Sequence, residues 1–468
     1  MDEEAPAVGE YALDIAELVR SRAGEGHALQ MKLLNPQLPR MLHAIGFDRD
    51  YVRAEGAYLY DRSGADYLDM LAGFGVFGIG RNHPVVRASL TQAVDARMAD
   101  MVQFDSPLLA GLLAERLLSY APHLERAYFS NSGTEAVEAA LKFARYATGR
   151  TRILYFDHAF HGLTTGSLSV NGADEFRRGF GPLLPDTRLP FGDLDALERE
   201  LARGDVAALL MEPIQGKGVF VPEPGFLPAA QAALRRHGAL LICDEVQTGI
   251  GRTGKFFAYE HEGVEPDLVS VAKALSGGFV PIGATLGKSW IFDKVYSSMD
   301  RVLVHDCTFG SNVLAMTAGL ATLEVMEREQ LTARAARIGA LLTERLEQMA
   351  EKYELLTVVR GRGLMIGMEF GRPKSIKLRA GWNTLQAARH GLFAQMVVVP
   401  LFQRHRILTQ VAGDHMDVIK LIPPLTIGET EVDRFIEAFD DVMADAHRGT
   451  GLMWDFGRTL VKQALTRS

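Results

Sequence analysis

The chain has 468 residues, of which 47% are hydrophobic and 23% are charged, and its formal net charge at pH 7 is -8. This length and composition are typical of a globular protein with two or three domains and exclude a largely disordered chain. The negative charge argues against general nucleic-acid binding, which requires a basic surface for phosphate groups. The two cysteines, Cys243 and Cys307, form no metal-spaced pair, so we expect neither a disulfide framework nor a metal site.

The first residues, M-D-E-E-A-P, lack the basic and apolar segments of a signal peptide. No run of about 18 apolar residues is present either, so we expect a cytoplasmic protein without a membrane span. Amphipathic stretches occur near both ends, at 29–45 and 451–468. Two interpretations of them stay open: packing on the protein or on a second subunit, and contact with a lipid surface or an apolar substrate.

Residues 58–69, Y-L-Y-D-R-S-G-A-D-Y-L-D, have the pattern of a β-hairpin. Residues 73–78 then spell G-F-G-V-F-G, the glycine spacing of dinucleotide-binding folds. That fingerprint should end a strand and open a helix, but the next turn or helix start, at 82–84, comes several residues too late. The sequence therefore argues against a nicotinamide or flavin dinucleotide site.

From about residue 80 to 345, short apolar runs alternate with helical stretches. These runs are residues 126–130, 153–156, 206–211, 239–243 and 268–271. Near-continuous apolar strands between helices predict a mostly parallel sheet that is covered on both faces. A long helical stretch at about 313–350 follows, and residues 357–370 then alternate like one strand of a mixed domain.

The segment S-N-S-G-T-E, residues 130–135, lies between the first of these strands and a helix. Ser132 and Glu135 have the spacing of a capping box. The amides of Gly133 and Thr134 at a helix N-terminus form an anion site, because the helix dipole and the unpaired N–H groups both favour negative charge. Taken alone, the motif would favour a well-capped helix without a bound anion.

Residues 248–256, T-G-I-G-R-T-G-K-F, contain most of a nucleotide-binding phosphate loop. Phe256 stands where that loop requires a Ser or Thr for magnesium, and residues 244–248 separate the first glycine from the preceding strand. Both departures argue against an ATP site.

Asp244 and Lys273 end two successive candidate strands, where open α/β sheets bind their ligands. Burial there lowers the pKa of a lysine and frees its amine as a nucleophile. Together with the anion site, these residues meet three requirements of pyridoxal phosphate binding. The anion site holds the 5'-phosphate, Asp244 keeps the pyridine nitrogen protonated, and Lys273 forms the imine with the aldehyde.

From about Tyr58 to Leu425, the sequence resembles the class III aminotransferases, the ornithine and omega-amino-acid type of fold-type I pyridoxal phosphate enzymes. The motifs that carry the resemblance are Ser132–Ala136 (S-G-T-E-A), His158–Gly162 (H-A-F-H-G), Glu212–Gly216 (E-P-I-Q-G), Asp244–Gly249 (D-E-V-Q-T-G), Lys273 and Thr308–Asn312 (T-F-G-S-N). The resemblance implies an α/β fold: a large domain with a mostly parallel seven-stranded sheet and a smaller α+β domain built from both ends of the chain. We place the N-terminal part of the small domain at 1–79, the large cofactor-binding domain at 80–345, and the remainder of the small domain with its tail at 346–468.

The resemblance also implies the roles of site residues. Phe160 and Val246 would contact opposite faces of the cofactor ring, and Gln247 would reach toward the ring hydroxyl. Thr308 would bind the phosphate of the neighbouring subunit, which implies an obligate homodimer with shared active sites. The full set expected to bind the cofactor is Ser132, Gly133, Thr134, Phe160, His161, Glu212, Asp244, Val246, Gln247, Lys273 and Thr308.

The implied reaction is a ping-pong transfer of an amino group from an amine donor to a carbonyl acceptor, with Lys273 moving the proton and Asp244 supporting the cofactor ring. An aminomutase or racemase on the same scaffold remains an alternative. A cofactor-free binding protein is disfavoured because Lys273 and Asp244 are both present.

Two departures from the family's sequence pattern predict the substrate preference. Family members that act on ornithine or 4-aminobutyrate have a glutamate after E-P-I-Q and an arginine before the late P-P pair, whereas this chain has Lys217 and Lys420. Lysine orients a carboxylate less well than arginine, so we expect a substrate without a carboxylate beside its reacting carbon, unless an arginine in 404–406 substitutes. Phe74 and Phe77, with the long terminal regions, resemble members that aminate lipid or polyketide-like precursors such as hopanoids, so we include both as substrate candidates.

Overall fold

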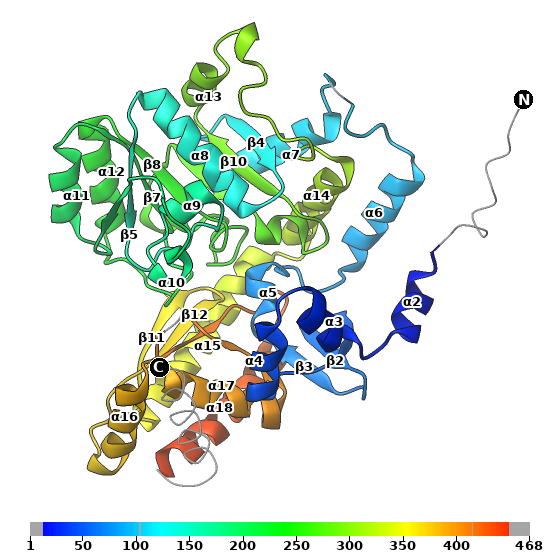
Figure 1. Cartoon of the computed structure of the whole chain (residues 1–468), viewed down its shortest axis with the longest axis vertical. Helices are drawn as coiled ribbons and strands as arrows, with labels where there is room; N and C mark the ends of the chain where they lie inside the picture. The colour runs from blue at the N-terminus through cyan, green and yellow to red at the C-terminus, as the bar shows by residue number, and fades with distance from the viewer. Residues whose placement is uncertain (1–12, 103, 414, 449–468) are drawn as a thin grey trace, which may run out of the picture. The chain divides into compact units, whose positions relative to one another are not determined.

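The computed structural model describes residues 13–102, 104–413 and 415–448. The chain divides into two compact units, one formed by Met1–Arg53 and Leu59–Asp66 and the other by Ala54–Tyr58 and Tyr67–Ser468. Figure 1 labels most of the helices and strands. Among the described helices, none is long and apolar enough to cross a membrane.

The first unit consists mainly of helices from the N-terminal part of the chain. It contains α2 (Ile15–Ser21), α3 (Gly26–Leu33) and α4 (Gln37–Ile45) and most of β1 (Tyr51–Glu55) and β2 (Tyr58–Asp61). The amphipathic stretch 29–45 lies in α3 and α4, which are separate helices because Pro36 disfavours helical geometry at Asn35. Leu18, Leu34 and Met41 are exposed apolar residues of this unit. The C-terminal stretch at 451–468 lies outside the described residues.

The second unit contains the large sheet. Its strands, in spatial order, are β4 (Arg126–Ser130), β10 (Gly283–Gly287), β9 (Leu268–Val271), β8 (Leu240–Asp244), β7 (Val206–Met211), β5 (Arg152–Phe156) and β6 (Thr187–Leu189). Only β10 is antiparallel to its neighbours, and the other pairs are parallel. The prediction of a mostly parallel seven-stranded sheet is confirmed, and all five apolar runs form strands in it.

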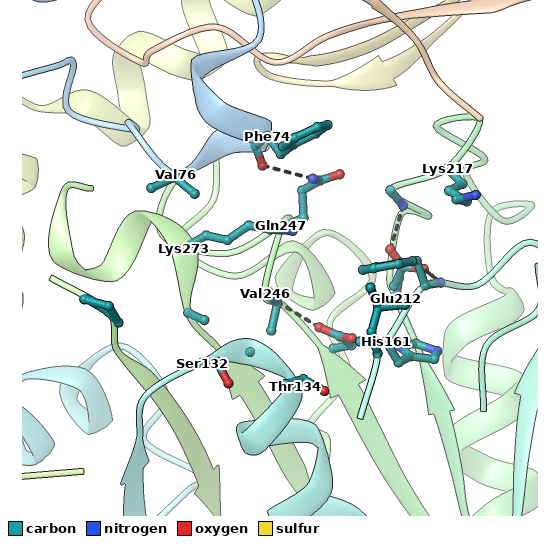
Figure 2. Close-up of a pocket in the computed structure, with 18 of the residues that line it drawn as sticks. Phe74, Val76, Ser132, Thr134, His161, Glu212, Lys217, Val246, Gln247 and Lys273 are labelled. Atoms are coloured by element: carbon teal, nitrogen blue, oxygen red, sulfur yellow. Dashed lines mark hydrogen bonds and ion pairs between the residues drawn. The ribbon is translucent and has the colours of Figure 1, made fainter. Parts of the chain in front are cut away.

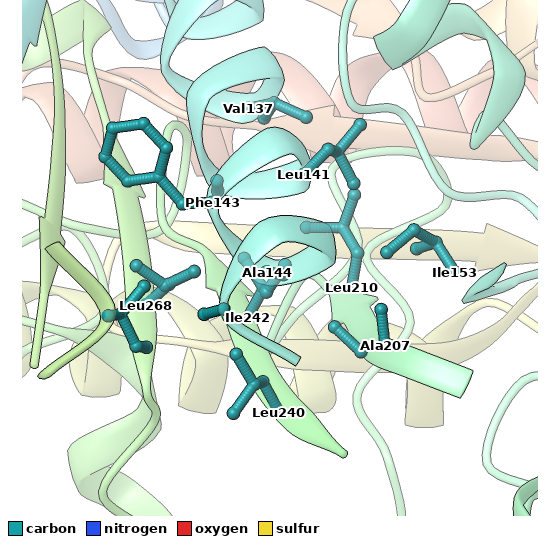
Figure 3. Close-up of a cluster of buried hydrophobic side chains, with 14 of the residues drawn as sticks. Val137, Leu141, Phe143, Ala144, Ile153, Ala207, Leu210, Leu240, Ile242 and Leu268 are labelled. Atoms are coloured by element: carbon teal, nitrogen blue, oxygen red, sulfur yellow. The ribbon is translucent and has the colours of Figure 1, made fainter. Parts of the chain in front are cut away.

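The core of this unit lies between the sheet and α8 (Gly133–Thr148). The helix places Val137, Leu141 and Ala144 against strand residues that include Leu210 and Ile242, and all five side chains are buried (Figure 3). Helix α8 packs across several strands because its apolar residues recur at helical spacing. Its N-terminus is thereby fixed at the end of β4.

The remaining helices of this part of the chain surround the sheet or connect its strands. They are α6 (Pro84–Asp95), α7 (Leu108–Ser119), α9 (Thr165–Ser169), α10 (Asp174–Arg177), α11 (Leu194–Leu201), α12 (Phe226–His237), α13 (Ser289–Val295), α14 (Val313–Arg328), and the 3-10 turns η1 (Ala258–Glu262), η2 (Lys273–Ser276) and η3 (Met299–Arg301).

The helical stretch at 313–350 is confirmed, whereas the prediction of one strand at 357–370 is wrong. The helical stretch 313–350 is two helices, α14 and α15 (Leu331–Lys352), because Gln330 adopts a left-handed φ of 51° between them. The stretch 357–370 is a hairpin of β11 (Leu356–Arg362) and β12 (Met365–Phe370) rather than one strand. Its turn requires Gly363, which has φ of 53° and would bring a Cβ atom to 2.5 Å from the backbone of Thr253.

The C-terminal region forms a smaller α+β layer. Its sheet has the order β11, β12, β15 (Val418–Leu421), β14 (Gln410–Val411), and its helices are α15, α16 (Ile376–Ala388), α17 (Leu392–His405) and α18 (Glu429–Arg448). Strand β13 (Ile407–Leu408) pairs in parallel with β3 (Asp66–Asp69), through Leu68 and Asp69. Segments from both ends of the chain therefore combine, as expected, whereas the domain limits 1–79, 80–345 and 346–468 stay predictions.

Candidate active site

Residues at the carboxyl ends of the strands surround a cavity of about 1040 Å³ (Figure 2). Most of the predicted site residues line it, although they come from widely separated segments. These are Phe74, Ser132, Gly133, Thr134, Phe160, His161, Glu212, Lys217, Asp244, Val246, Gln247, Lys273 and Lys420. The parallel topology explains the convergence, because all strands except β10 end at the same edge.

The N-terminus of α8 forms one end of the cavity. The Ser132 hydroxyl accepts from the Glu135 amide at 3.3 Å, and the Glu135 carboxylate accepts from the Asn131 amide at 2.6 Å. The predicted cap is present. In an ideal capping box, however, Glu135 would accept from the amide of the N-cap residue Ser132 rather than from that of Asn131. The hydroxyl of Thr134 lies 2.6 Å from that of Ser167 on α9. This helix end offers backbone and hydroxyl donors to an anion.

Asp244, the last residue of β8, is buried and held at both oxygens. His161 Nδ1 lies 2.7 Å from Oδ2, and the Val246 amide donates to Oδ1 at 3.0 Å. The Val246 side chain lies over the start of α8, where a Cβ on Gly133 would be only 2.7 Å from Val246 Cγ1. Glycine is therefore required at position 133 for the close approach of these two cavity walls.

Glu212 follows β7 and connects two loops of the site. Its carboxylate accepts from the Phe160 amide at 3.0 Å and from the Gly216 amide at 2.6 Å. Burial raises the pKa of Glu212, His161 opposes this shift, and Asp244 adds to it. Glu212 thus fixes the backbone of Phe160, whose ring lines the cavity.

Lys273 begins the 3-10 turn after β9. Its φ of 46° lies in the left-handed region, which is uncommon for a residue with a side chain and is found at functional sites. Burial lowers the pKa of the Lys273 amine, while Asp244 and Glu212 oppose the shift. A lowered pKa increases the fraction of the amine that acts as a nucleophile.

Gln247 and Lys420 contact each other across the cavity wall. Lys420 Nζ donates to Gly216 O at 2.7 Å and to Gln247 Oε1 at 3.1 Å, and Gln247 Nε2 donates to Phe74 O at 3.0 Å. Burial, and secondarily Lys273, lower the pKa of Lys420 to about 7. Lys420 is 3% exposed, and within the described part of the chain no carboxylate forms an ion pair with it.

Lys217 has an acidic partner of its own. Its Nζ forms an ion pair with Glu175 of α10 and lies 4.1 Å from the ring centre of Phe176. Phe176 packs edge-to-face on Phe160 at 5.2 Å. Sequence reasoning missed Glu175 and Phe176, and no local signal marks them, because their partners are more than ten residues away.

Two predicted site residues do not line the cavity. Phe77 packs behind it, where a Cβ on Gly278 would lie 2.4 Å from the Phe77 ring. Thr308 belongs to the segment before α14, and its proposed role involves a second subunit. The neighbouring Cys307 sulfur accepts from Asn131 Nδ2 at 3.1 Å, so this segment lies next to a residue that lines the cavity.

The loop 248–256 connects the site to the C-terminal layer. Buried Arg252 donates to the carbonyls of Leu364 and Pro423, and burial lowers its pKa to about 9. The loop that has the glycine spacing of a nucleotide site is therefore packed around the hairpin of β11 and β12.

The residues of the cavity fit pyridoxal phosphate. The α8 N-terminus supplies donors for a phosphate group, Asp244 supplies a buried carboxylate for a protonated ring nitrogen, and Lys273 supplies an amine for the aldehyde. A side chain at position 133 would collide with Val246 at this wall, so glycine fits there. Among the described residues, no group of three or more His, Cys, Asp or Glu side chains is placed to hold a metal ion.

Similarity to known aminotransferases covers most of the chain. The family "Aminotransferase class-III" matches residues 43–443. Aminotransferase PigE of a Serratia species is 38% identical over 476 residues; the match covers 94% of this chain and 56% of that protein, so the chain spans little more than half of this relative.

Two solved structures extend the comparison. The Toxoplasma gondii ornithine aminotransferase has a TM-score of 0.76 and 28% identity over 90% of this chain and 99% of its own. An amine transaminase of an uncultivated Pseudomonas species, in its PLP-bound form, has a TM-score of 0.75 and 30% identity over 85% and 95%. Fold and site agree with these matches, and the chain belongs to the class III aminotransferases, pyridoxal phosphate-dependent enzymes of fold type I.

Proposed function

We propose that this aminotransferase works by a ping-pong mechanism on an amine whose reacting carbon has no adjacent carboxylate and is attached to a longer apolar chain. The observation that carries the proposal is the pairing of Lys217 with Glu175, which leaves Lys420 without an acidic partner among the described residues. The resemblance to enzymes that act on lipid or polyketide-like precursors is part of the same proposal.

The proposed reaction gives tasks to Lys273, Asp244, the N-terminus of α8, Phe160 and Val246. Pyridoxal phosphate, when bound, supplies an aldehyde and an electron-accepting ring. Lys273 Nζ is the proposed nucleophile and the base that removes the proton from the amine-bearing carbon. Asp244 would supply the charge that stabilises a protonated ring nitrogen, and the α8 N-terminus would bind the phosphate. Phe160 and Val246 would hold the ring.

The apolar part of the cavity supports the substrate class. Residues that sequence analysis did not select contribute to it, namely Val76, Leu163, Phe176, Phe279, Val280 and Ile282. Phe74 adds an aromatic side chain that is 53% exposed. An alkyl or aryl chain would lose contact with water on binding such a wall. This burial stabilises the complex by roughly 25 cal/mol for each Å² of apolar surface.

We include a homodimer in the proposal. The segments around Asp100 and Val313 are in contact, because the Val313 amide donates to Asp100 Oδ1 at 2.9 Å. Both segments are rich in exposed apolar side chains, among them Met98, Met101, Val102, Leu303, Val304 and Phe309. Contiguous exposed apolar surface of this kind is typical of subunit interfaces. Thr308 lies within it, as a shared phosphate site would require.

The dimer can be tested by light scattering. A double variant, Leu303→Glu with Val304→Glu, should be monomeric and should release cofactor faster, whereas Thr308→Ala should remain dimeric and release cofactor faster. A wild-type protein that is monomeric at micromolar concentration would contradict this part of the proposal.

The proposed location is the cytoplasm, which the two unpaired cysteines support.

The reaction is tested by separating its two halves. Holoenzyme mixed with one long-chain primary amine and no acceptor should lose its initial visible absorbance and release one carbonyl product for each active site. Added pyruvate should then restore the spectrum. An aminomutase or racemase would instead convert the substrate catalytically with no second substrate and no released carbonyl product.

A further inference from the structure

Lys217 contacts two successive residues of α10, Glu175 and Phe176. Its Nζ forms an ion pair with the Glu175 carboxylate and lies 4.1 Å from the centre of the Phe176 ring. The Lys217 side chain is 13% exposed and that of Glu175 is 35% exposed, so water screens their attraction only in part. The face of an aromatic ring also attracts a cation. The two contacts therefore favour one arrangement of the Glu175 and Phe176 side chains.

The loop that carries Lys217 is fixed on both sides of this residue. The Gly216 amide donates to Glu212 at 2.6 Å, and Arg360 donates to the carbonyl of Gly218 at 2.7 Å. Lys217 and Glu212 both line the cavity (Figure 2). Lys217 thus extends from a backbone whose position is determined by residues outside α10.

Helix α10 is in turn held by contacts that do not involve Lys217. The Arg177 guanidinium donates to the carbonyls of Ser169 and Asn171, both at 2.9 Å. Asn171 is fully buried, so its bond is shielded from water. Loss of the Lys217 contacts would therefore leave α10 in place and act on the side chains that face Lys217.

The ring of Phe176 is the part of α10 that lines the cavity. It packs edge-to-face on Phe160 with the ring centres 5.2 Å apart, which is a favourable arrangement of two aromatic rings. A phenylalanine ring turns about two side-chain bonds, so its contacts decide between its rotamers. Lys217 on one ring face and Phe160 at an edge-to-face contact together favour the observed rotamer. A different rotamer would change the width of the cavity beside Phe160.

We propose that Lys217 is a positioning residue that holds the Phe176 ring as a wall of the cavity and thereby limits the width of the chain attached to the reacting carbon. This inference rests on the proposed function, because it concerns the longer apolar chain of the proposed amine. It gives Lys217 a different task from the contact with a substrate carboxylate that the sequence pattern of the family suggests.

The test compares hexylamine with 4-phenylbutylamine, which have the same reacting carbon and differ in the width of the far end. The measured quantity is kcat/KM for 4-phenylbutylamine divided by kcat/KM for hexylamine. The two corresponding alcohols have no amino group to transfer, so their inhibition constants give the same preference for binding alone. Both preferences are defined so that a higher value favours the wider chain.

Four variants of the holoenzyme are compared with the wild type. Lys217→Met removes the charge and keeps an unbranched side chain, and Glu175→Gln removes the ion pair. Phe176→Ala removes the proposed wall. Lys217→Arg is the conservative control, because arginine also pairs with carboxylates and stacks on aromatic rings.

We expect Phe176→Ala to raise both preferences about tenfold, as is typical when an apolar pocket is enlarged. Lys217→Met and Glu175→Gln should raise them at least about threefold, and Lys217→Arg should stay within about twofold of the wild type. Adding Lys217→Met to Phe176→Ala should change the preferences by less than about twofold, because both substitutions act through one ring.

Effects of Phe176→Ala and Lys217→Met that multiply in the double variant would overturn the inference, because Lys217 would then act independently of Phe176. Wild-type preferences in Phe176→Ala, or in both Lys217→Met and Glu175→Gln, would overturn it as well. If Lys217→Met does not fold, Glu175→Gln at its more exposed site takes its place, alone and combined with Phe176→Ala.

The same experiment separates this inference from the proposed function. If the wild type uses ornithine in preference to both amines, the proposed substrate class is wrong. The two alcohols, measured as inhibitors of ornithine turnover, then decide the role of Lys217. Failure of both alcohols to inhibit would overturn the inference.

Discussion

Lys420 Nζ lies 3.1 Å from Oε1 of Gln247, and the opposite end of that amide donates to the carbonyl of Phe74. Lys420 also donates to Gly216 O at 2.7 Å. A neutral lysine amine has two hydrogens, enough for both acceptors, so the contacts persist without the positive charge. Protonation adds a third hydrogen, which is free to bind a substrate oxygen.

Lys420 should therefore make the use of carboxylate-bearing substrates depend on pH. As the pH rises through about 7, the amine loses its proton, so kcat/KM for ornithine and 4-aminobutyrate should fall, whereas kcat/KM for long-chain primary amines should not follow this titration. Lys420→Arg should improve the use of ornithine and 4-aminobutyrate, because guanidinium stays charged and binds carboxylates through two parallel hydrogen bonds. The measurement is kcat/KM for each substrate from pH 6 to 9, with Lys217→Arg as a matched control. Efficient turnover of ornithine by the wild type, unchanged in Lys420→Arg, would contradict the proposed substrate class.

Lys420 should also affect how stability varies with pH. The pKa of Lys420 is about 7 in the folded protein, and its ordinary value, taken for the unfolded chain, is 10.5. Between these two pH values, the unfolded chain therefore binds more protons than the folded protein. The Lys420 contribution to the free energy of unfolding therefore rises with pH across this window. Lys420→Met lacks this contribution. The free energy of unfolding of the variant minus that of the wild type should therefore decrease from pH 7 to pH 10. Urea titrations at fixed cofactor concentration measure it, with Lys255→Met as an exposed control. A stability difference that is independent of pH would show that burial does not disfavour the charged form of Lys420.

Lys273→Ala should abolish steady-state turnover and leave the cofactor bound without a covalent bond. The α8 N-terminus and Asp244 are unchanged in this variant, so the phosphate and ring contacts survive. Borohydride reduction followed by peptide mapping should find the cofactor attached to Lys273 in the wild type. Attachment at Lys420, a buried lysine that also lines the cavity, would refute the assignment.

Asp244→Asn should lower the rate by orders of magnitude with little effect on the fold, since it retains the shape of the side chain and removes its charge. Stopped-flow measurement of the first half-reaction isolates this effect from product release. A rate within about tenfold of the wild type, or about 1.4 kcal/mol in barrier, would show that this carboxylate is not the partner of the ring nitrogen.

The sequence was sufficient for five of the seven strands of the large sheet and for the residues at their ends. Apolar runs such as 206–211 are unambiguous because all six residues of β7 are buried, and short motifs place Asp244 and Lys273 directly after such runs. The N-terminus of α8 was equally clear, since Ser132 and Glu135 are local partners. These features depend on neighbouring residues, and periodicity and capping rules describe them well.

The remaining features depend on contacts between distant segments. The partner of Lys217 is Glu175 and that of Asp244 is His161, and neither pair has a characteristic spacing. The division of 357–370 into a hairpin follows from the approach of Gly363 to Thr253, over one hundred residues earlier. Tertiary packing determines such contacts, so a single sequence does not predict them.

Phe143 tests the core on which the position of α8 depends. It is 1% exposed, and its ring packs edge-to-face on Phe292 at 5.0 Å and on Tyr296 at 5.9 Å. Phe143→Ala should reduce the free energy of unfolding by about 3–5 kcal/mol, because it removes buried surface and leaves a cavity that the sheet only partly fills. Phe180→Ala, at a site that is 69% exposed, should change it by less than about 0.5 kcal/mol. Since α8 carries the proposed phosphate site at its other end, Phe143→Ala should also weaken cofactor retention, measured by dilution at a temperature where the variant remains folded. A loss of stability below about 1 kcal/mol would mean that α8 is not anchored by this cluster.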